Sequence, residues 1–210
     1  MTKCENKARE LLIKQNITGF AIDVTKLQFN KTVIFDTFEG YAQAAGIPDL
    51  FSEKFKDGCT LIKGDIHIIL THEPHPQSFH RHSPKNRSCA NRLNWTLAHE
   101  AGHVVLGHRW DGEREEREAH CFAAELLMPE LILLELSNRL KRKLDIYEVS
   151  RLFNVSESAS AARLAQFERK NLYSAYLRKE LLKKYKDLIE NYEQHCRNRR
   201  TPERGQINPF

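Results

Sequence analysis

The sequence of 210 residues contains no apolar run that approaches the roughly 20 consecutive residues needed to cross a lipid bilayer. Its first 12 residues alternate charged and apolar positions and lack the continuous apolar segment of a signal peptide. Both absences argue against a membrane-spanning or exported chain. We therefore expect a soluble cytoplasmic protein that has no membrane partner.

Paired cysteines are also missing. The five cysteines are odd in number, widely spaced and without a Cys-x-x-Cys pair, which argues against a disulfide framework and against a cysteine-rich zinc module. The sequence has no internal repeat and no low-complexity segment either. We expect five reduced thiols: Cys4, Cys59, Cys89, Cys121 and Cys196.

An excess of one charge is nearly absent from residues 1–170, which carry 24 Lys and Arg against 23 Asp and Glu. Residues 171–210 carry nine against five, so most of the net charge of +5 belongs to this end. We predict one globular domain over 1–170 and a basic helical tail over 171–210, disordered over residues 198–210. The tail is interpreted as a helix with a solvated basic face that packs on the body or on a partner, and binding of an acidic partner or nucleic acid is the alternative.

The order of the expected elements predicts an α+β fold. A helix is indicated over residues 3–15, a strand over 32–38 and a hairpin over 59–71 that turns at Gly64 and Asp65, with an irregular stretch over 40–58. Helical periodicity follows over 88–107, 113–128, 130–143, 145–153, 156–170 and 172–192. We predict a small antiparallel or mixed sheet packed on a helical bundle, with a helix-turn-helix-like part at 145–170.

A loop rich in proline and histidine is expected over residues 73–87, just before the long helices. Its histidines lack the fixed spacing of a helix or a turn, so contact with a substrate or simple exposure is favoured over metal binding. The histidines are His75, His80 and His82. The role of this loop stays open.

Residues 99–103 read His-Glu-Ala-Gly-His, an H-E-x-x-H pattern. Positions i and i+4 of a helix lie one above the other, so His99 and His103 can bind one metal ion while Glu100 holds a water and serves as its base. The apolar stripe of this helix lies on a separate face and consists of Leu93, Leu97, Ala101 and Val104. The histidines are therefore not core residues, and the pattern indicates a zincin-like active-site helix.

A third metal ligand is expected, because catalytic zinc takes three protein ligands and keeps one position for water. The reversal at residues 109–112 brings the helix 113–128 back antiparallel to the first. The buried stripe of this second helix is predicted to be Ala119, Phe122, Ala123 and Leu126. Periodicity places Glu115 near the centre of the stripe and Glu116 and Glu118 on its opposite borders, which leaves Glu115 and Glu118 open as the ligand.

Two segments resemble the ImmA/IrrE family of metallopeptidases: residues 92–103 (RLNWTLAHEAGH) and 118–129 (EAHCFAAELLMP). Residues 152–156 (LFNVS) and Arg163-Leu164 also resemble the family's pattern, and the resemblance extends over about residues 5–168 but not into the tail. It implies that Glu118 is the third zinc ligand, since the family's ligand is the glutamate of a Glu-Ala-x-x-Phe-Ala run. The sequence departs from the family at His120, where asparagine is frequent, and in the histidine-rich loop.

The resemblance also implies an activity and a partner. Members of the family are typically zinc endopeptidases that cleave a helix-turn-helix transcriptional repressor, often in the control of mobile elements or of stress responses. Zinc would polarise the scissile carbonyl and Glu100 would transfer the proton. The donor to the oxyanion stays open among His120, Arg92 and the loop residues.

Two other classes of function compete with a peptidase. Residues 145–164 resemble a helix-turn-helix, which would suit a DNA-binding regulator, but the second helix offers few groove-reading side chains, namely Ser158, Ser160 and Arg163. We therefore favour packing of this part around the active-site helices. A metal-stabilised interaction module is the third class, and the presence of Glu100 argues against it because a purely structural zinc site has no use for a base.

Overall fold

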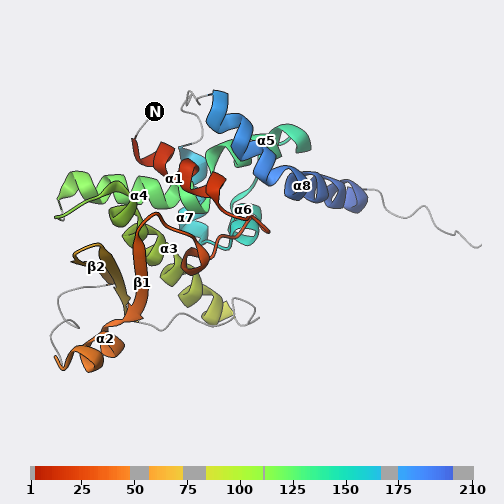
Figure 1. Cartoon of the computed structure of the whole chain (residues 1–210). Helices are drawn as coiled ribbons and strands as arrows, with labels where there is room; N and C mark the ends of the chain where they lie inside the picture. Colours follow the sequence, from red (N-terminus) through yellow and green to blue (C-terminus); the bar gives the residue numbers. More distant parts are fainter. Residues whose placement is uncertain (1–2, 48–56, 73–83, 111, 167–174, 201–210) are drawn as a thin grey trace, which may run out of the picture.

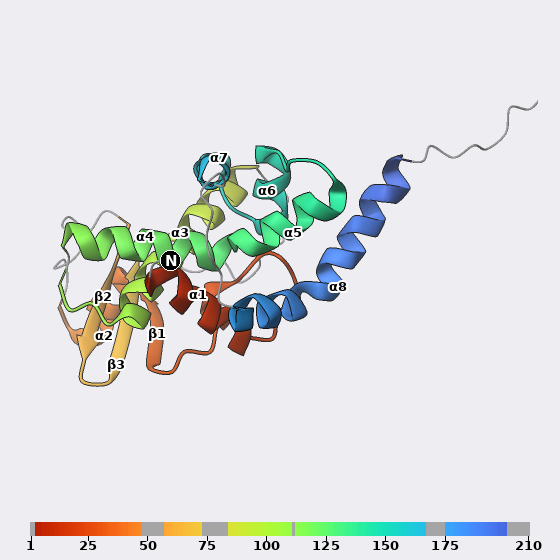
Figure 2. The ribbon, with the colours of Figure 1, turned by 90° about the horizontal axis from the view of Figure 1, so that it is seen from above.

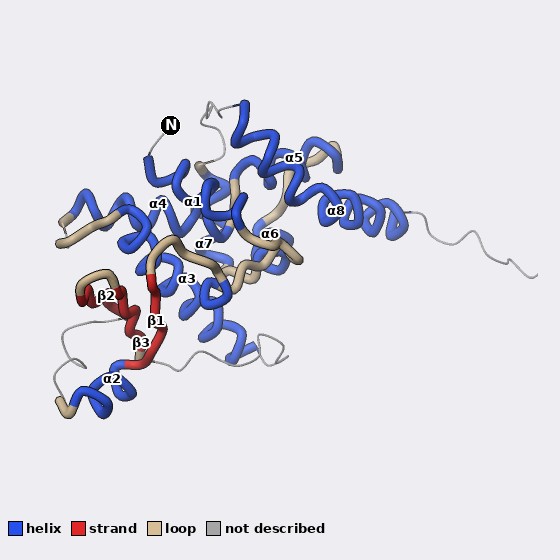
Figure 3. Tube along the Cα trace, viewed as in Figure 1, coloured by secondary structure: helices blue, strands red, loops and turns tan. Residues whose placement is uncertain are grey.

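The computed structural model describes residues 3–47, 57–72, 84–110, 112–166 and 175–200 (Figure 1). These parts of the chain are mostly helical, with three strands (Figure 3), and the predicted α+β class is confirmed. The elements, in chain order, are α1 (Lys3–Lys14), η1 (Val24–Lys26), β1 (Thr32–Thr37), α2 (Phe38–Ala45), β2 (Gly58–Lys63), β3 (Ile66–Thr71), α3 (Pro84–Leu106), α4 (Glu113–Leu127), α5 (Glu130–Leu140), α6 (Ile146–Phe153), α7 (Glu157–Ala165) and α8 (Ala175–Arg200).

The three strands form a mixed sheet with the order β1-β3-β2. β1 is parallel to β3, with Ile34 opposite Ile68, and β2 is antiparallel to β3, with Thr60 opposite Ile69. The predicted hairpin is confirmed, because β2 and β3 are joined at Gly64, whose φ of 61° suits a residue without a side chain. β2 therefore forms one edge of the described sheet.

The sheet lies at one end of the molecule and α8 at the other, with α1, α3 and α4 between them (Figures 1 and 2). The core is built mainly from α1, α3, α4, α5 and the first half of α8. The C-terminal end of α8 points away from the sheet in both views. None of the described helices is long and apolar enough to cross a bilayer.

α3 and α4 pack closely because a glycine lies at their contact. A Cβ atom on Gly102 would meet both the Cα of Ala119 and the Cδ1 of Phe122 at 3.2 Å. The predicted stripes of both helices are buried, including Ala101 and Ala123, which have no exposed surface. Gly102 thus lets α4 approach the helix that carries the His-Glu-x-x-His residues.

The edge strand β2 also approaches α3 closely. A Cβ atom on Gly58 would lie 2.7 Å from the Cγ2 of Thr96 and 3.0 Å from the carbonyl oxygen of Leu70. Any larger residue at this position would therefore push β2 away from α3. The close approach brings the next residues of β2 over the middle of α3.

A buried ion cluster joins three helices that are distant in sequence. Glu125 of α4 has no exposed surface, and its carboxylate accepts from the Nε of Arg9 of α1 at 2.7 Å and from the guanidinium of Arg163 of α7. Arg163 also donates to the carbonyl oxygen of Met128 at 3.0 Å. Arg163 and Ser160, two of the three polar residues that could have read DNA, are therefore buried in the core.

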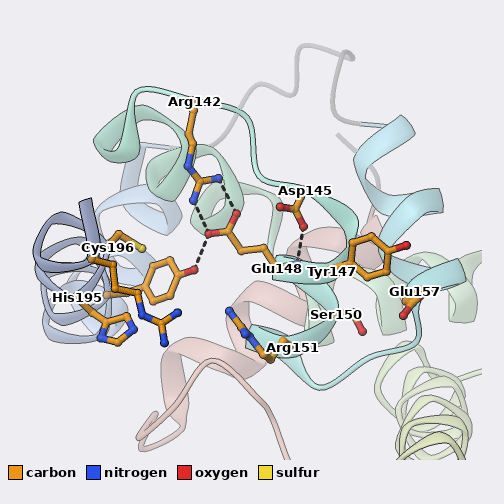
Figure 4. Close-up of a pocket in the computed structure, with 11 residues that line it drawn as sticks. Arg142, Asp145, Tyr147, Glu148, Ser150, Arg151, Glu157, His195 and Cys196 are labelled. Atoms are coloured by element: carbon orange, nitrogen blue, oxygen red, sulfur yellow. Dashed lines mark hydrogen bonds and ion pairs between the residues drawn. The ribbon is translucent and has the colours of Figure 1, made fainter. Parts of the chain in front are cut away.

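The start of α8 belongs to the same core as α1 and α5. Leu181 and Tyr185 have no exposed surface and lie in the main apolar cluster. Further along α8, the hydroxyl of Tyr192 donates to Glu148 of α6 at 2.5 Å, and Arg142 donates to the same carboxylate at 2.7 and 2.8 Å (Figure 4). The basic tail is thus docked on the body through both apolar and polar contacts.

Three expected element boundaries were wrong. α2 covers Phe38, the expected end of a strand, and residues 40–45 of the expected irregular segment, because the side chain of Thr37 accepts from the backbone N–H of Gly40 and caps this short helix. α3 begins at Pro84, inside the expected loop, since proline is tolerated in the first turn of a helix. α8 continues to Arg200, beyond the expected end at 192. The rest of the histidine-rich loop, residues 73–83, and residues 201–210 lie outside the described parts.

Candidate active site

The two histidines of the His-Glu-x-x-His pattern meet on one face of α3. The Nε2 atoms of His99 and His103 are 3.1 Å apart, and their side chains are 12% and 8% exposed. Both line a cavity of about 520 Å³ bounded by β2, α3 and α4. The helical spacing therefore brings the two imidazoles together as predicted.

The carboxylate beside this pair belongs to Glu116 of α4. Its Oε2 is 3.2 Å from the Nε2 of His99, and its Oε1 is 3.4 Å from the Nε2 of His103. Glu118, the ligand that the sequence resemblance implied, instead lies 3.2 Å from His108 and accepts from the Nε of Arg114 at 2.9 Å. These bonds from Arg114 and His108 keep the pKa of Glu118 below its ordinary value.

The rotation of α4 about its axis explains why Glu116 and not Glu118 meets the histidines. The backbone of α4 comes closest to Gly102 at Ala119. At about 100° per residue, Glu116 lies about 60° from Ala119 on one side, and Glu118 lies about 100° from it on the other. The two glutamates therefore straddle the helix contact, and Glu118 faces the residues that follow α3.

The donor atoms of His99, His103 and Glu116 fit a zinc ion. Zinc bonds of about 2.0–2.2 Å in a tetrahedron require neighbouring donor atoms about 3.3–3.6 Å apart. The two Nε2 atoms are 3.1 Å apart, and the two oxygens of Glu116 lie 3.2 Å from His99 and 3.4 Å from His103. One ligand atom from each of the three side chains lies within 4.8 Å of the other two. Two imidazole nitrogens and one carboxylate are also the donor set of many catalytic zinc sites.

The electrostatics of His99 favour a metal ligand. Burial, together with the neighbouring His120, His103 and His108, lowers the pKa of His99 to about 3. Its imidazole is therefore neutral near pH 7 and keeps a lone pair for a cation. The ring of His120 packs against that of His99 at an angle of 54°, with the two centroids 4.5 Å apart.

Glu100 is held by a residue of the edge strand. Its side chain is buried, and its Oε2 accepts from the hydroxyl of Thr60 of β2 at 2.7 Å. The close approach of β2 at Gly58 makes this contact geometrically feasible. Sequence reasoning missed Thr60, because no local pattern reveals which strand residue will lie over a helix some 40 positions later.

The other predicted participants lie at different distances from this centre. His120 lines the cavity of the histidine pair. Of the open choices for the oxyanion donor, it is the one that the structure places in this cavity. Arg92 pairs with Asp57 at the surface and lines a neighbouring groove instead. The loop residues 73–83 are not described. Trp110, 74% exposed, is a further residue at the rim of the cavity.

A second, larger groove of about 760 Å³ adjoins the cavity and is lined mainly by apolar atoms of α3, α4 and α7. Trp95 and His120 line both the cavity and this groove, so the two are adjacent. The floor of the groove includes Met128, Val155 and Ala159. A long, partly apolar ligand could therefore extend from the histidine pair toward α7.

Comparison with protein families gives one match. Residues 67–165 match the model of the family Peptidase_M78, described as the IrrE N-terminal-like domain. This stretch begins in β3, ends with α7 and contains both histidines, Glu100, Glu116 and Glu118. A comparison with curated proteins finds no match to the chain.

Proposed function

We propose, because the chain belongs to the ImmA/IrrE family of metallopeptidases, that it is a zinc-dependent endopeptidase. The observation that carries the proposal is one cavity that contains three suitably spaced metal donors and a buried carboxylate beside them. In this proposal His99, His103 and Glu116 bind the ion. Glu116 replaces Glu118 in this role, since Glu118 lies with His108 and Arg114 instead.

The chain supplies a base and the means to orient it. Zinc in this site would act as a Lewis acid that polarises the scissile carbonyl and lowers the pKa of water to about 7. Glu100, next to His99 in sequence, takes the proton of the attacking water and delivers it to the leaving nitrogen. Thr60 holds one carboxylate oxygen of Glu100 at 2.7 Å and so restricts the rotation of that side chain.

A polypeptide is the substrate that suits the adjoining groove. The cavity of about 520 Å³ and the groove of about 760 Å³ together exceed what a single amino acid needs, and they lie next to each other at Trp95 and His120. We propose a regulatory protein as the substrate, specifically a helix-turn-helix repressor of a mobile-element or stress response in the cytoplasm. Family membership supports this choice of partner.

The structure buries two of the three residues on which the DNA-binding alternative depends. Ser160 has no exposed surface, and Arg163 is 6% exposed and engaged with Glu125, so α7 offers little to a DNA groove. The interaction-module alternative does not account for a buried Glu100 oriented by Thr60. Neither alternative is proposed as the function.

The decisive experiment uses Glu100→Gln, with Glu113→Gln as a matched control. Glu113 lies in the first turn of α4 and its side chain is 93% exposed. Each protein is loaded with zinc and mixed with purified helix-turn-helix repressors from the same genome, and the products are read by intact mass. We expect both variants to bind about one zinc, and Glu100→Gln alone to lose cleavage. Undiminished cleavage by Glu100→Gln would refute the assignment of the base.

A further inference from the structure

The turn at the end of α3 returns the chain to the active site. α3 ends at Leu106, and Gly107 adopts a φ of 76°, the left-handed conformation that commonly terminates helices. The backbone N–H groups of Gly107 and His108 both donate to the carbonyl oxygen of His103 at 3.0 Å. His108 is thereby folded back beside His103, with the two ring centroids 5.1 Å apart.

A continuous chain of side-chain contacts leads from this pair to α4. The Nδ1 of His108 lies 3.1 Å from the Nδ1 of His103, and the Nε2 of His108 lies 3.2 Å from the Oε2 of Glu118. The other oxygen of Glu118 accepts from the Nε of Arg114 at 2.9 Å. The side chain of His108 is 9% exposed, so water has little access to the contact with His103.

One assignment of hydrogens satisfies every contact in this chain. The carboxylate of Glu118 can only accept, so the Nε2 of His108 carries a hydrogen. A neutral His108 then has a bare Nδ1 that accepts, and the facing Nδ1 of His103 must donate. The remaining nitrogen of His103, Nε2, is left with its lone pair, and it is this atom that faces His99 and Glu116.

We propose that His108 and Glu118 are positioning residues for the metal, which fix the tautomer and the ring orientation of His103 so that its Nε2 lone pair points at the ion. This inference rests on the proposed function, because it assumes that His103 binds a metal. Glu118 acts through His108 and does not touch the ion. Partners of this kind commonly change metal affinity by 10–100-fold when they are removed.

Zinc affinity, measured on the full chain by competition with a chelator, tests the proposal. His108→Leu keeps the bulk of the side chain without its hydrogen bonds, whereas the amide of His108→Gln can both accept from His103 and donate to Glu118. We expect His108→Leu and Glu118→Ala to bind zinc about 10–100-fold more weakly than the wild type and still reach one zinc per chain at saturation. His108→Gln should recover much of the loss, and the surface variant Glu113→Gln should bind as the wild type does.

Each contrary outcome has a separate meaning. Wild-type affinity in both His108→Leu and Glu118→Ala would overturn this inference while the proposed function stands. Loss of all zinc in Glu118→Ala, as in His99→Ala, would overturn it by making Glu118 a direct ligand. Failure of the wild type itself to bind zinc would overturn the proposed function and this inference with it. Thermal unfolding of the metal-free variants should match the wild type, and a large drop in Tm would attribute the loss to misfolding and overturn the positioning role.

Discussion

Replacement of the buried Glu125 should be among the most destabilising single changes in this chain. Glu125→Gln keeps the shape of the side chain but leaves the charges of Arg9 and Arg163 without their counter-ion, in a place where these two residues are 0% and 6% exposed. Removal of one partner from a buried ion pair costs about 3–5 kcal/mol. At about 2–4 °C per kcal/mol for a chain of this size, we expect Tm to fall by about 6–20 °C.

Thermal and urea unfolding of the metal-free protein measure this effect. Glu113→Gln is the matched control, because its side chain is 93% exposed and should change stability by less than about 0.5 kcal/mol. A triple variant with Arg9→Met, Glu125→Leu and Arg163→Met should recover much of the loss, since no buried charge then remains unpaired. A loss below about 1 kcal/mol in Glu125→Gln would refute the view that this cluster ties α1 and α7 to α4.

Two further predictions concern the metal site. Glu116→Ala should lower the zinc content of the purified protein as severely as His103→Ala, whereas Glu115→Ala should keep close to one zinc per chain; full occupancy in Glu116→Ala would assign the ion to another carboxylate. The pKa of His99, lowered to about 3 from 6.5, means that the unfolded chain binds more protons at this position between those two pH values. The metal-free protein should therefore lose stability as the pH falls from 6.5 toward 3. In urea unfolding, His99→Leu should show a weaker dependence of the free energy of unfolding on pH. The same pH dependence in the variant and the wild type would contradict the burial of His99.

Local periodicity was enough to predict the histidine pair and the β-hairpin. The i, i+4 spacing alone brings His99 and His103 together, and the turn at Gly64 lies between two short segments rich in branched residues. The choice between Glu116 and Glu118 depends instead on how α4 is rotated against α3. The Gly102–Ala119 contact determines that rotation, and no pattern within either helix encodes it.

Long-range contacts and weak local preferences account for the other misses. Thr60 reaches Glu100 because β2 packs against α3, and a strand threonine has no distinguishing mark in the sequence. The eight-residue α2 is capped by Thr37 at its start and by Gly46 at its end, and the glycines and proline of residues 40–58 had indicated an irregular segment instead. Arg163 could be interpreted as a DNA contact until its burial against Glu125 was known.

The sheet is not contained within the residues that the family model matches, because β3 pairs with β1, which precedes the match. The match begins at residue 67, so β1, β2 and α1 precede it, while α8 follows it. An excised fragment of residues 67–165 would leave β3 as a lone strand with both edges unpaired, which favours aggregation. The fragment would also lack Arg9, so the buried Glu125 would lose one of its two counter-ions. It would also lack Thr60, the residue that orients the proposed base. Truncation experiments should therefore begin near residue 1 and end near residue 200, whatever the extent of sequence similarity.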